Sequence, residues 1–361
     1  MEDNKQIQRA GEGSQQIQAQ TVIFNNGITE ERARAIFKEM NEFALQEYTK
    51  DAYEIATNRI NCFKNKLMPR ILSIENALPM FADPAFQFQL KSAQRTAAAS
   101  ERQNDYDLLT ELLVCHIQKG NDRKNRAGIS KAVEIVDEID NDALCALTVV
   151  HAIAQFRPVT GWVKDGLELF NDLFSKILYE KLPSGDRWLD HLDVLGAIRI
   201  MQLGSLKPLD KYYVEKLEGY SCVGIEKTSE NYKKAEEYLK NAALSTSILV
   251  DNECMKGDVR LPVVKITDIG QLQITNADGS RLVNDAERKV LESIWELYDK
   301  DTEKLKEAHN NFMELWDSFK VLKKIHIWWD DIPYSFSISQ VGTILAHTNA
   351  KRCDTNVPDL I

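Results

Sequence analysis

The sequence predicts a mainly α-helical protein: a helical bundle with a long N-terminal helix, preceded by a self-pairing β segment and followed by a small α+β C-terminal domain. Apolar residues recur every three or four positions through most of the 361 residues, which is the spacing of one face of an amphipathic helix. Two stretches depart from this spacing. Residues 17–24 alternate at the period of a strand, and residues 259–274 contain two short runs typical of strands.

The first 27 residues form a Gln-rich segment unlike the rest of the chain. This segment has too little apolar surface to be stable alone. Stacking against copies of itself would give every backbone group a partner and would add ladders of Gln side chains. We therefore expect residues 1–27 to be an oligomerisation segment and the protein to be a homo-oligomer. The residues expected to make the contacts between copies are Gln6, Ile7, Gln8, Gln16, Ile17, Gln18 and Ile23.

Residues 28–68 are predicted to form the long helix. Thr29 is suited to cap its start, and Glu30 and Glu31 lie at the positive end of the helix dipole. The helical period continues to Leu67, before Pro69 interrupts it. The pattern fits one helix or two nearly collinear helices. It also fits either a stalk beside the oligomerisation segment or a helix that packs along its own domain.

Residues 69–252 are predicted to be a helical domain of packed hairpins. Short polar breaks separate the helical stretches, and turns rich in Pro and Gly fall at 157–161 and 183–185. The stretch 188–201 is predicted to be one helix that ends before Gly204.

Residues 253–361 are predicted to be a mixed α/β domain. Two short strands are expected within 259–266 and 270–274, then a turn at 276–279, then helices over 286–299 and 302–324. The segment after His326 is too apolar to be a free tail, because it includes Trp328 and Trp329, and we expect it to dock on the body of the protein.

Composition excludes several classes of protein. The formal net charge of −10 and the isoelectric point near 5.3 argue against a general nucleic-acid-binding surface, which needs Lys and Arg to displace counterions from phosphates. The chain has no apolar run long enough to span a bilayer and no signal-peptide layout, so a cytoplasmic location is expected. The six cysteines are scattered without a C-x-x-C pair, which argues for reduced thiols and against a zinc site.

The sequence shows no recognisable catalytic constellation. It contains no Gly-rich phosphate loop and no G-x-S-x-G, so we assign no catalytic residue, no metal ligand and no cofactor, and we leave the question of enzymatic activity open. His191 lies between Asp190 and Asp193, but neighbouring side chains on a helix point in different directions. His326 with Asp330 and Asp331 is the candidate set for a metal-dependent effector enzyme.

Two places are candidates for contact with a partner or a phosphate. The basic run 119–126 supplies Arg123, Lys124 and Arg126, although such runs are also common as solubilising loops. Trp328 and Trp329 are the second place, as an aromatic anchor. The basic run also keeps a DNA-binding regulator open as an alternative, which would require a positive face on an acidic molecule.

Four stretches together resemble an uncharacterised bacterial family with a Gln-rich N-terminal strand and a terminal V-G-x-x-x-A-H motif. These stretches are the Gln-rich start, residues 81–94, residues 107–136, and the end, where Val341, Gly342, Ala346 and His347 form the motif. More distantly, residues 105–155 and the same terminal motif resemble the abortive-infection alpha proteins, which act in defence against bacteriophage. The chain departs from the family over 353–361, where it ends sooner and is less apolar.

The resemblance implies a role in anti-phage defence and carries over no catalytic residue. The function we expect is therefore that of a non-enzymatic, homo-oligomeric bacterial protein that assembles through its N-terminal strands and recruits or senses a partner. That partner would be a phage or host protein. The alternatives are the DNA-binding regulator and the metal-dependent effector enzyme.

Overall fold

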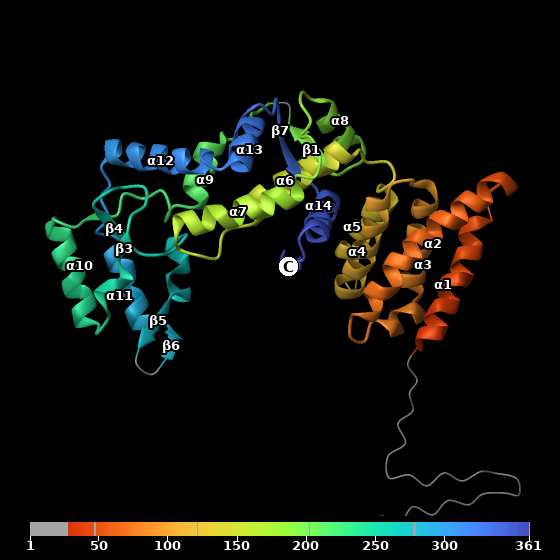
Figure 1. Ribbon diagram of the computed structural model, residues 1–361, viewed down its shortest axis with the longest axis horizontal. Coiled ribbons are helices and arrows are strands. Elements are labelled where there is room, and N and C mark those ends of the chain that lie inside the picture. Colours follow the sequence, from red (N-terminus) through yellow and green to blue (C-terminus); the bar gives the residue numbers. More distant parts are fainter. Residues whose placement is uncertain (1–27, 47, 121, 202, 277–278, 361) are drawn as a thin grey trace, which may run out of the picture.

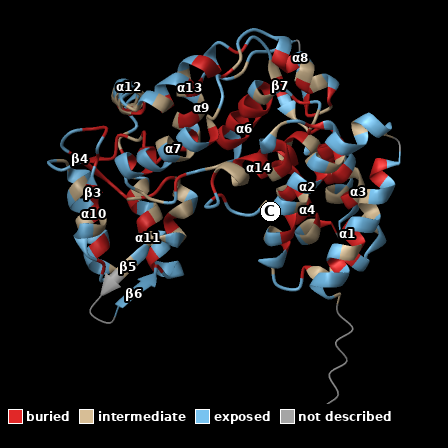
Figure 2. Cartoon of the chain, turned by 45° about the vertical axis from the view of Figure 1, so that its right-hand side comes forward, coloured by how far each residue is buried: buried red, intermediate tan, exposed pale blue. Residues whose placement is uncertain are grey.

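The computed structural model describes residues 28–46, 48–120, 122–201, 203–276 and 279–360, and these residues are mainly helical (Figure 1). They form an arch, with an N-terminal helical bundle at one end and a smaller mixed unit at the other (Figure 2). The segment expected to join copies, with Gln6, Ile17 and Ile23, lies outside the described residues. None of the described helices has both the length and the apolar character that crossing a membrane requires.

The N-terminal bundle contains the first five α-helices and one 3-10 helix. In chain order they are α1 (Glu30–Leu45), α2 (Lys50–Leu72), η1 (Leu78–Ala82), α3 (Pro84–Ala99), α4 (Gln103–Lys119) and α5 (Arg123–Glu134). Side chains cap these helices where the sequence suggests: Thr29 accepts from Arg32 N at 3.2 Å, and Asp83 accepts from Phe86 N at 2.9 Å.

The segment 28–68 is divided between two helices. The chain turns after Leu45, and α1 and α2 lie side by side against α3 (Figure 1). Pro69 lies inside the last turn of α2 rather than beyond its end. These two helices are therefore part of the bundle and not a protruding stalk.

The middle of the chain forms the top of the arch. Its elements are α6 (Asn141–Gln155), α7 (Val163–Ile177), α8 (Arg187–Val194), β1 (Ile198–Met201) and α9 (Leu209–Lys216). The single helix predicted over 188–201 is wrong, because it ends at Val194 and a strand follows. Gly196 adopts a positive φ of 75°, and Ala197 N donates to Leu192 O at 2.8 Å, which closes the helix end in the manner of a Schellman motif.

The mixed unit has its own core. Its elements are β2 (Ile225–Glu226), α10 (Glu230–Asn241), η2 (Thr246–Ile248), β3 (Val250–Asp251), β4 (Asp258–Arg260), η3 (Ile266–Gln271), β5 (Gln273–Asn276), β6 (Gly279–Leu282) and α11 (Asp285–Trp295). The strands are antiparallel in the order β2-β4-β3, with a separate β5-β6 hairpin. The expected strands within 259–266 and 270–274 are thus shorter than predicted and partly replaced by η3.

The last elements return to the top of the arch and pack into the larger hydrophobic core, which the N-terminal bundle and the middle of the chain share. They are α12 (Thr302–Asp317), α13 (Lys320–Asp330), β7 (Ser335–Ile338) and α14 (Gln340–Cys353). Strand β7 pairs with β1, with Ile338 opposite Ile198, and α14 packs against α4, α5 and α6. The core of the mixed unit draws on residues between about 222 and 298, on both sides of the predicted boundary at 252/253.

Candidate binding cleft

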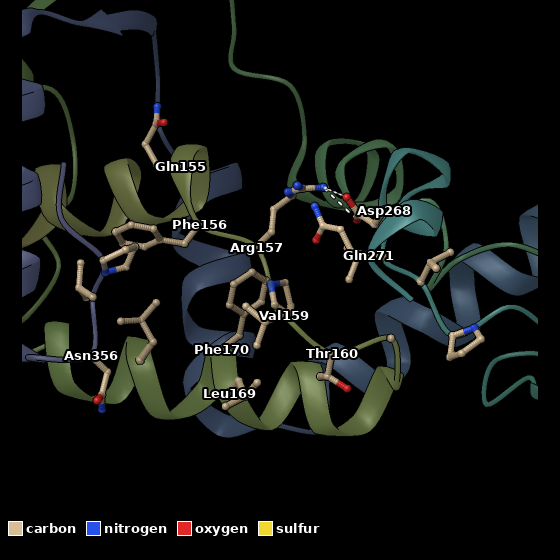
Figure 3. Close-up of a pocket in the computed structure, with 18 of the residues that line it drawn as sticks. Gln155, Phe156, Arg157, Val159, Thr160, Leu169, Phe170, Asp268, Gln271 and Asn356 are labelled. Atoms are coloured by element: carbon tan, nitrogen blue, oxygen red, sulfur yellow. Dashed lines mark hydrogen bonds and ion pairs between the residues drawn. The ribbon is translucent and has the colours of Figure 1, made fainter. Parts of the chain in front are cut away.

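A cleft of about 490 Å³ opens between the helical core and the mixed unit. Three loops and one helix line it: residues 155–161 between α6 and α7, the inner face of α7, residues 262–272 after β4, and residues 354–358 after α14 (Figure 3). A volume of this size is in the range of ligand-binding pockets, about 300–1,000 Å³.

One wall of the cleft is apolar. Helix α7 contributes Leu169, Phe170 and Leu173, and the loop after β4 contributes Val263 and Val264. Val159 at the mouth of the cleft is 95% exposed, and Leu169 is 49% exposed, so apolar side chains face solvent here. Exposed apolar side chains around a concave surface are typical of sites that bind another molecule.

The polar side of the cleft is formed by Arg157 and Asp268 (Figure 3). Arg157 Nη1 lies 3.2 Å from Asp268 Oδ2, and the ion pair joins the α6–α7 loop to η3. Asp268 Oδ2 also accepts from the backbone N–H of Lys265 at 3.0 Å, which caps the start of η3. Gln271 lies beside the pair, so charged and amide groups meet the apolar wall at one end of the cleft (Figure 3).

A fully buried arginine holds the loop that forms the rim. Arg260 of β4 donates from Nη2 to Gly161 O at 2.7 Å and from Nη1 to Leu261 O at 3.1 Å. Its guanidinium lies 3.5 Å from Glu253 Oε2, and Glu253 in turn accepts from Val163 N at 2.6 Å at the start of α7. The hydroxyl of Tyr220 donates to Thr160 O. The α6–α7 loop is thus fixed to the mixed unit by charge and hydrogen bonds rather than by its own secondary structure.

Two glycines, one in the rim loop and one between α9 and β2, allow close backbone approach to the segment after β4. A Cβ on Gly161 would collide with the backbone of Pro262, and a Cβ on Gly219 would collide with Val263 O. Backbone segments can come this close only where one residue has no side chain. The rim loop and the chain before β2 therefore both lie in close backbone contact with the segment after β4.

Lys216 is the last residue of α9, and its side chain contacts the C-terminal end of α6. Its ammonium donates to Ala154 O at 2.9 Å and to Ile153 O, and it lies 5.7 Å from the centre of the Tyr212 ring. Burial, followed by the nearby charges of Arg157 and Lys265, lowers the pKa of Lys216 to about 7. The helix carbonyls act in the opposite direction, because they accept hydrogen bonds from the charged form.

A buried histidine pair fixes the segment after α14. His347 Nε2 donates to Pro358 O at 2.9 Å, so its Nδ1 is the acceptor for His151 Nε2 at 3.2 Å. His151 Nδ1 is then a buried acceptor without a hydrogen-bond partner among the described residues. Burial, followed by the neighbouring charge of His347, lowers the pKa of His151 to about 3. Both rings are therefore neutral at pH 7.

The candidate contacts predicted from the sequence lie elsewhere. Arg123 and Lys124 are exposed and Arg126 is half-buried in the first turn of α5, where Asp122 caps the helix through Lys124 N at 2.9 Å. Trp328 and Trp329 are buried, at 9% and 5% exposure. Their indole N–H groups donate to Pro183 O and Lys207 O, both at 2.9 Å, so this segment docks on the body as expected.

The histidines considered for catalysis have structural hydrogen bonds. His326 Nδ1 lies 2.9 Å from Asp317 Oδ1 and its Nε2 lies 3.4 Å from Asp330 Oδ2. Its acidic partners are thus Asp317 and Asp330, not Asp331, and Asp330 also accepts from Leu209 N at the start of α9. His191 Nε2 accepts from Asp140 N at 3.2 Å. The described residues contain no group of His, Cys, Asp and Glu arranged to hold a metal ion.

Of the parts that line the cleft, the turn at 157–161 was predicted from the sequence, without a function. The signal that could have drawn attention to it is Val159, an apolar residue next to a proline in a turn that is otherwise polar or small. Helix α7 follows this turn directly, but the other two walls come from residues about 100 and 200 positions further along the chain. The fold brings these distant segments together, and no local sequence pattern predicts it.

The chain matches the model of a protein family. A family model that describes an uncharacterised family matches residues 27–360, which include every residue that lines the cleft. Residues 1–26 lie outside the match. No curated protein and no solved structure matches the chain.

Proposed function

The chain belongs to the uncharacterised family whose model matches residues 27–360, and we propose that the cleft, which lies within these residues, is where the protein recruits its partner. The protein is proposed to be a non-enzymatic, homo-oligomeric bacterial defence protein against bacteriophage. Its N-terminal strands assemble the copies, and the cleft of each copy binds a segment of a phage or host protein.

The observation that carries this proposal is an apolar wall exposed in a rigid concave surface. Leu169 and Val159 remain exposed although hydrophobic burial favours covering them by about 25 cal/mol per Å². The loops around them are fixed by Arg260, Glu253 and Tyr220 before any partner binds. A surface held in its binding conformation loses little conformational entropy on association, which favours recognition.

The proposal is tested by phage challenge of bacteria that express the protein. Val159→Asp introduces a charge at the mouth of the cleft, where the native side chain makes little contact with the protein, so folding should be unaffected. Val194→Asp is the matched control, because Val194 is also a strongly exposed valine, 84%, but lies at the end of α8.

We expect Val159→Asp to abolish protection while its melting temperature stays within a degree or two of wild type. Val194→Asp should protect as well as wild type. Full protection by Val159→Asp at normal expression would show that the cleft is not the partner site, and loss of protection by both variants would show that the effect is not specific to the cleft.

A further inference from the structure

The β5–β6 hairpin of the mixed unit has an open edge that suits the N-terminal segment of another copy. We infer that residues 16–19 of one copy add as a third strand to the outer edge of β5 in a second copy. This inference rests on the proposed function, since it names the surface that receives the N-terminal strands by which the copies assemble.

The hairpin is a sheet of only two strands among the described residues. It lies at the foot of the arch, at the end of the mixed unit (Figure 1), and β6 is exposed along its whole length. A hairpin of two strands is at best marginally stable in water, and a third strand or a packed helix is usually needed. A further strand would therefore stabilise this element.

The outer edge of β5 carries backbone groups that β6 does not use. Val283 N donates to Leu272 O at 3.0 Å, which makes these two residues a hydrogen-bonded pair of the antiparallel ladder. Such pairs alternate with pairs that exchange no hydrogen bond. In the register of the hairpin, the N–H and C=O groups of Gln273 and Thr275 consequently point away from β6.

The two edges of the hairpin differ in how they are protected. Natural edge strands usually carry charged residues, proline or bulges that prevent pairing with other strands. Residues 273–276 of β5 contain neither a charged residue nor a proline. On β6, by contrast, Arg281 donates from Nη1 to Leu282 O at 3.0 Å and so uses an acceptor of that edge. The edge of β5 is therefore the one better suited to another strand.

The N-terminal segment repeats the sequence pattern of this edge. Two glutamines separated by Ile or Leu occur at 6–8, 16–18 and 271–273. In 16–19, as in 271–274, glutamine alternates with an aliphatic residue. Leu272 and Ile274 are half-buried against the core of the mixed unit, whereas Gln273 between them is exposed.

A strand formed by residues 16–19 would match β5 side chain by side chain. Because side chains alternate between the two faces of a sheet, Gln18 would lie beside Gln273 on the exposed face in either strand direction. Ile17 and Ala19 would then lie beside Leu272 and Ile274 on the core side. Adjacent glutamines form ladders of side-chain hydrogen bonds, and the added backbone pairs with the open edge.

The segment that docks comes from a neighbouring copy. The hairpin and the start of α1, which residues 1–27 precede, lie at opposite ends of the arch (Figures 1 and 2). The contact therefore joins two different surfaces, head to tail, and each copy offers both a segment and an edge. Contacts of this kind build rings or filaments.

The inference is tested by light scattering on purified full-length variants. Gln273→Pro removes an outward N–H group from β5 and breaks no hydrogen bond to β6, because Gln273 belongs to a pair without hydrogen bonds. Leu282→Pro is the matched control, since Leu282 lies opposite Gln273 and its N–H points outward from β6. Ile17→Asp alters the docking segment instead. Gln273→Lys keeps the backbone donor, adds a charge to the edge and serves if the proline disturbs folding.

We expect Leu282→Pro to form the same oligomer as wild type. Gln273→Pro and Ile17→Asp should each fall to the mass of one chain, 41.2 kDa, and Gln273→Lys should also lower the mass. An equimolar mixture of Gln273→Pro and Ile17→Asp should regain pairs of twice that mass. In each pair, the intact segment of the first variant would dock on the intact edge of the second.

Docking on β5 would be overturned by a wild-type mass in Gln273→Pro and Gln273→Lys, by an equal loss in Leu282→Pro, or by a mixture without pairs. A lower mass after deletion of residues 1–27, together with an unchanged mass in Gln273→Pro, would mean that the N-terminal segments stack on one another, as the proposed function allows. A wild type that is a single chain would overturn both this inference and the proposed assembly. The phage challenge with Val159→Asp decides the role of the cleft separately.

Discussion

At the scale of single residues, Trp328 has the clearest structural role. Its ring is 9% exposed, lies 5.8 Å from the ring of Trp188 and donates a hydrogen bond to Pro183 O. Replacing Trp328 with Ala leaves a cavity and an acceptor without its donor, so we expect a loss of about 3–5 kcal/mol in unfolding free energy, measured by urea titration. Trp162→Ala is the control, because that ring is 46% exposed, and an equal loss in both variants would contradict this account.

His151 makes stability depend on pH. Burial holds its pKa at about 3 in the folded protein, against 6.5 for a free histidine, so the unfolded chain binds the proton that the folded chain rejects. The contribution to stability is present above pH 6.5 and is lost as the pH falls below it, at up to about 1.4 kcal/mol per pH unit. His347, whose pKa burial also lowers, adds to the effect, and Lys216 contributes a nearby charge.

We therefore expect the unfolding free energy to fall by about 1 kcal/mol or more between pH 6.5 and 5.5. His151→Gln should show a smaller fall, because the amide does not titrate and retains an N–H group to donate to His347 Nδ1. Denaturant titrations of wild type and variant at the two pH values check this. Parallel pH profiles would show that other groups are responsible.

At the scale of elements, the start of α7 depends on Glu253 rather than on a local cap. Its two carboxylate oxygens accept from Val163 N at 2.6 Å and Lys164 N at 3.2 Å, and the group also pairs with the buried Arg260. Glu253→Ala leaves that buried arginine without its carboxylate partner, so we expect a loss of about 3 kcal/mol in unfolding free energy. Glu253→Gln keeps one acceptor and should lose less, and thermal unfolding measures both.

The control is Glu230→Ala at the start of α10, where the carboxylate is 79% exposed and pairs with Lys233 on the surface. Its cost should stay below about 1 kcal/mol. If Glu253→Ala destabilises no more than Glu230→Ala, the start of α7 does not depend on this carboxylate.

Element starts could be predicted from the sequence where a side chain caps its own helix. Thr29 is such a case, and so is Asn284, which caps α11 through Ala286 N and Glu287 N. The sequence could not predict β1 and β7, because each is four residues long and exists only through pairing with the other. The cleft could not be predicted either, because it also depends on contacts between distant residues: Arg157 and Asp268 come together only in the folded chain.

At the scale of the whole molecule, residues 1–27 are expected to decide the oligomeric state. Removing them should lower the mass measured by light scattering and leave the helical circular dichroism signal nearly unchanged, because the described helices begin at Glu30. Ile17→Asp alone should have much of the same effect, since every copy would bring an unpaired charge into the stacked layer. An unchanged mass after the deletion would contradict assembly through this segment.

The return of the C-terminal elements to the top of the arch has a consequence for biosynthesis. Strand β1 and helices α4, α5 and α6 are synthesised well before β7 and α14, against which they pack in the finished protein. Until then, the surface that α14 will cover remains open to water, although Leu345, Ala346 and Ala350 are fully buried in the finished protein. Because contacts between distant parts of a chain form slowly, the nascent protein exposes this apolar surface until α14 has been synthesised, and exposed apolar surface favours aggregation.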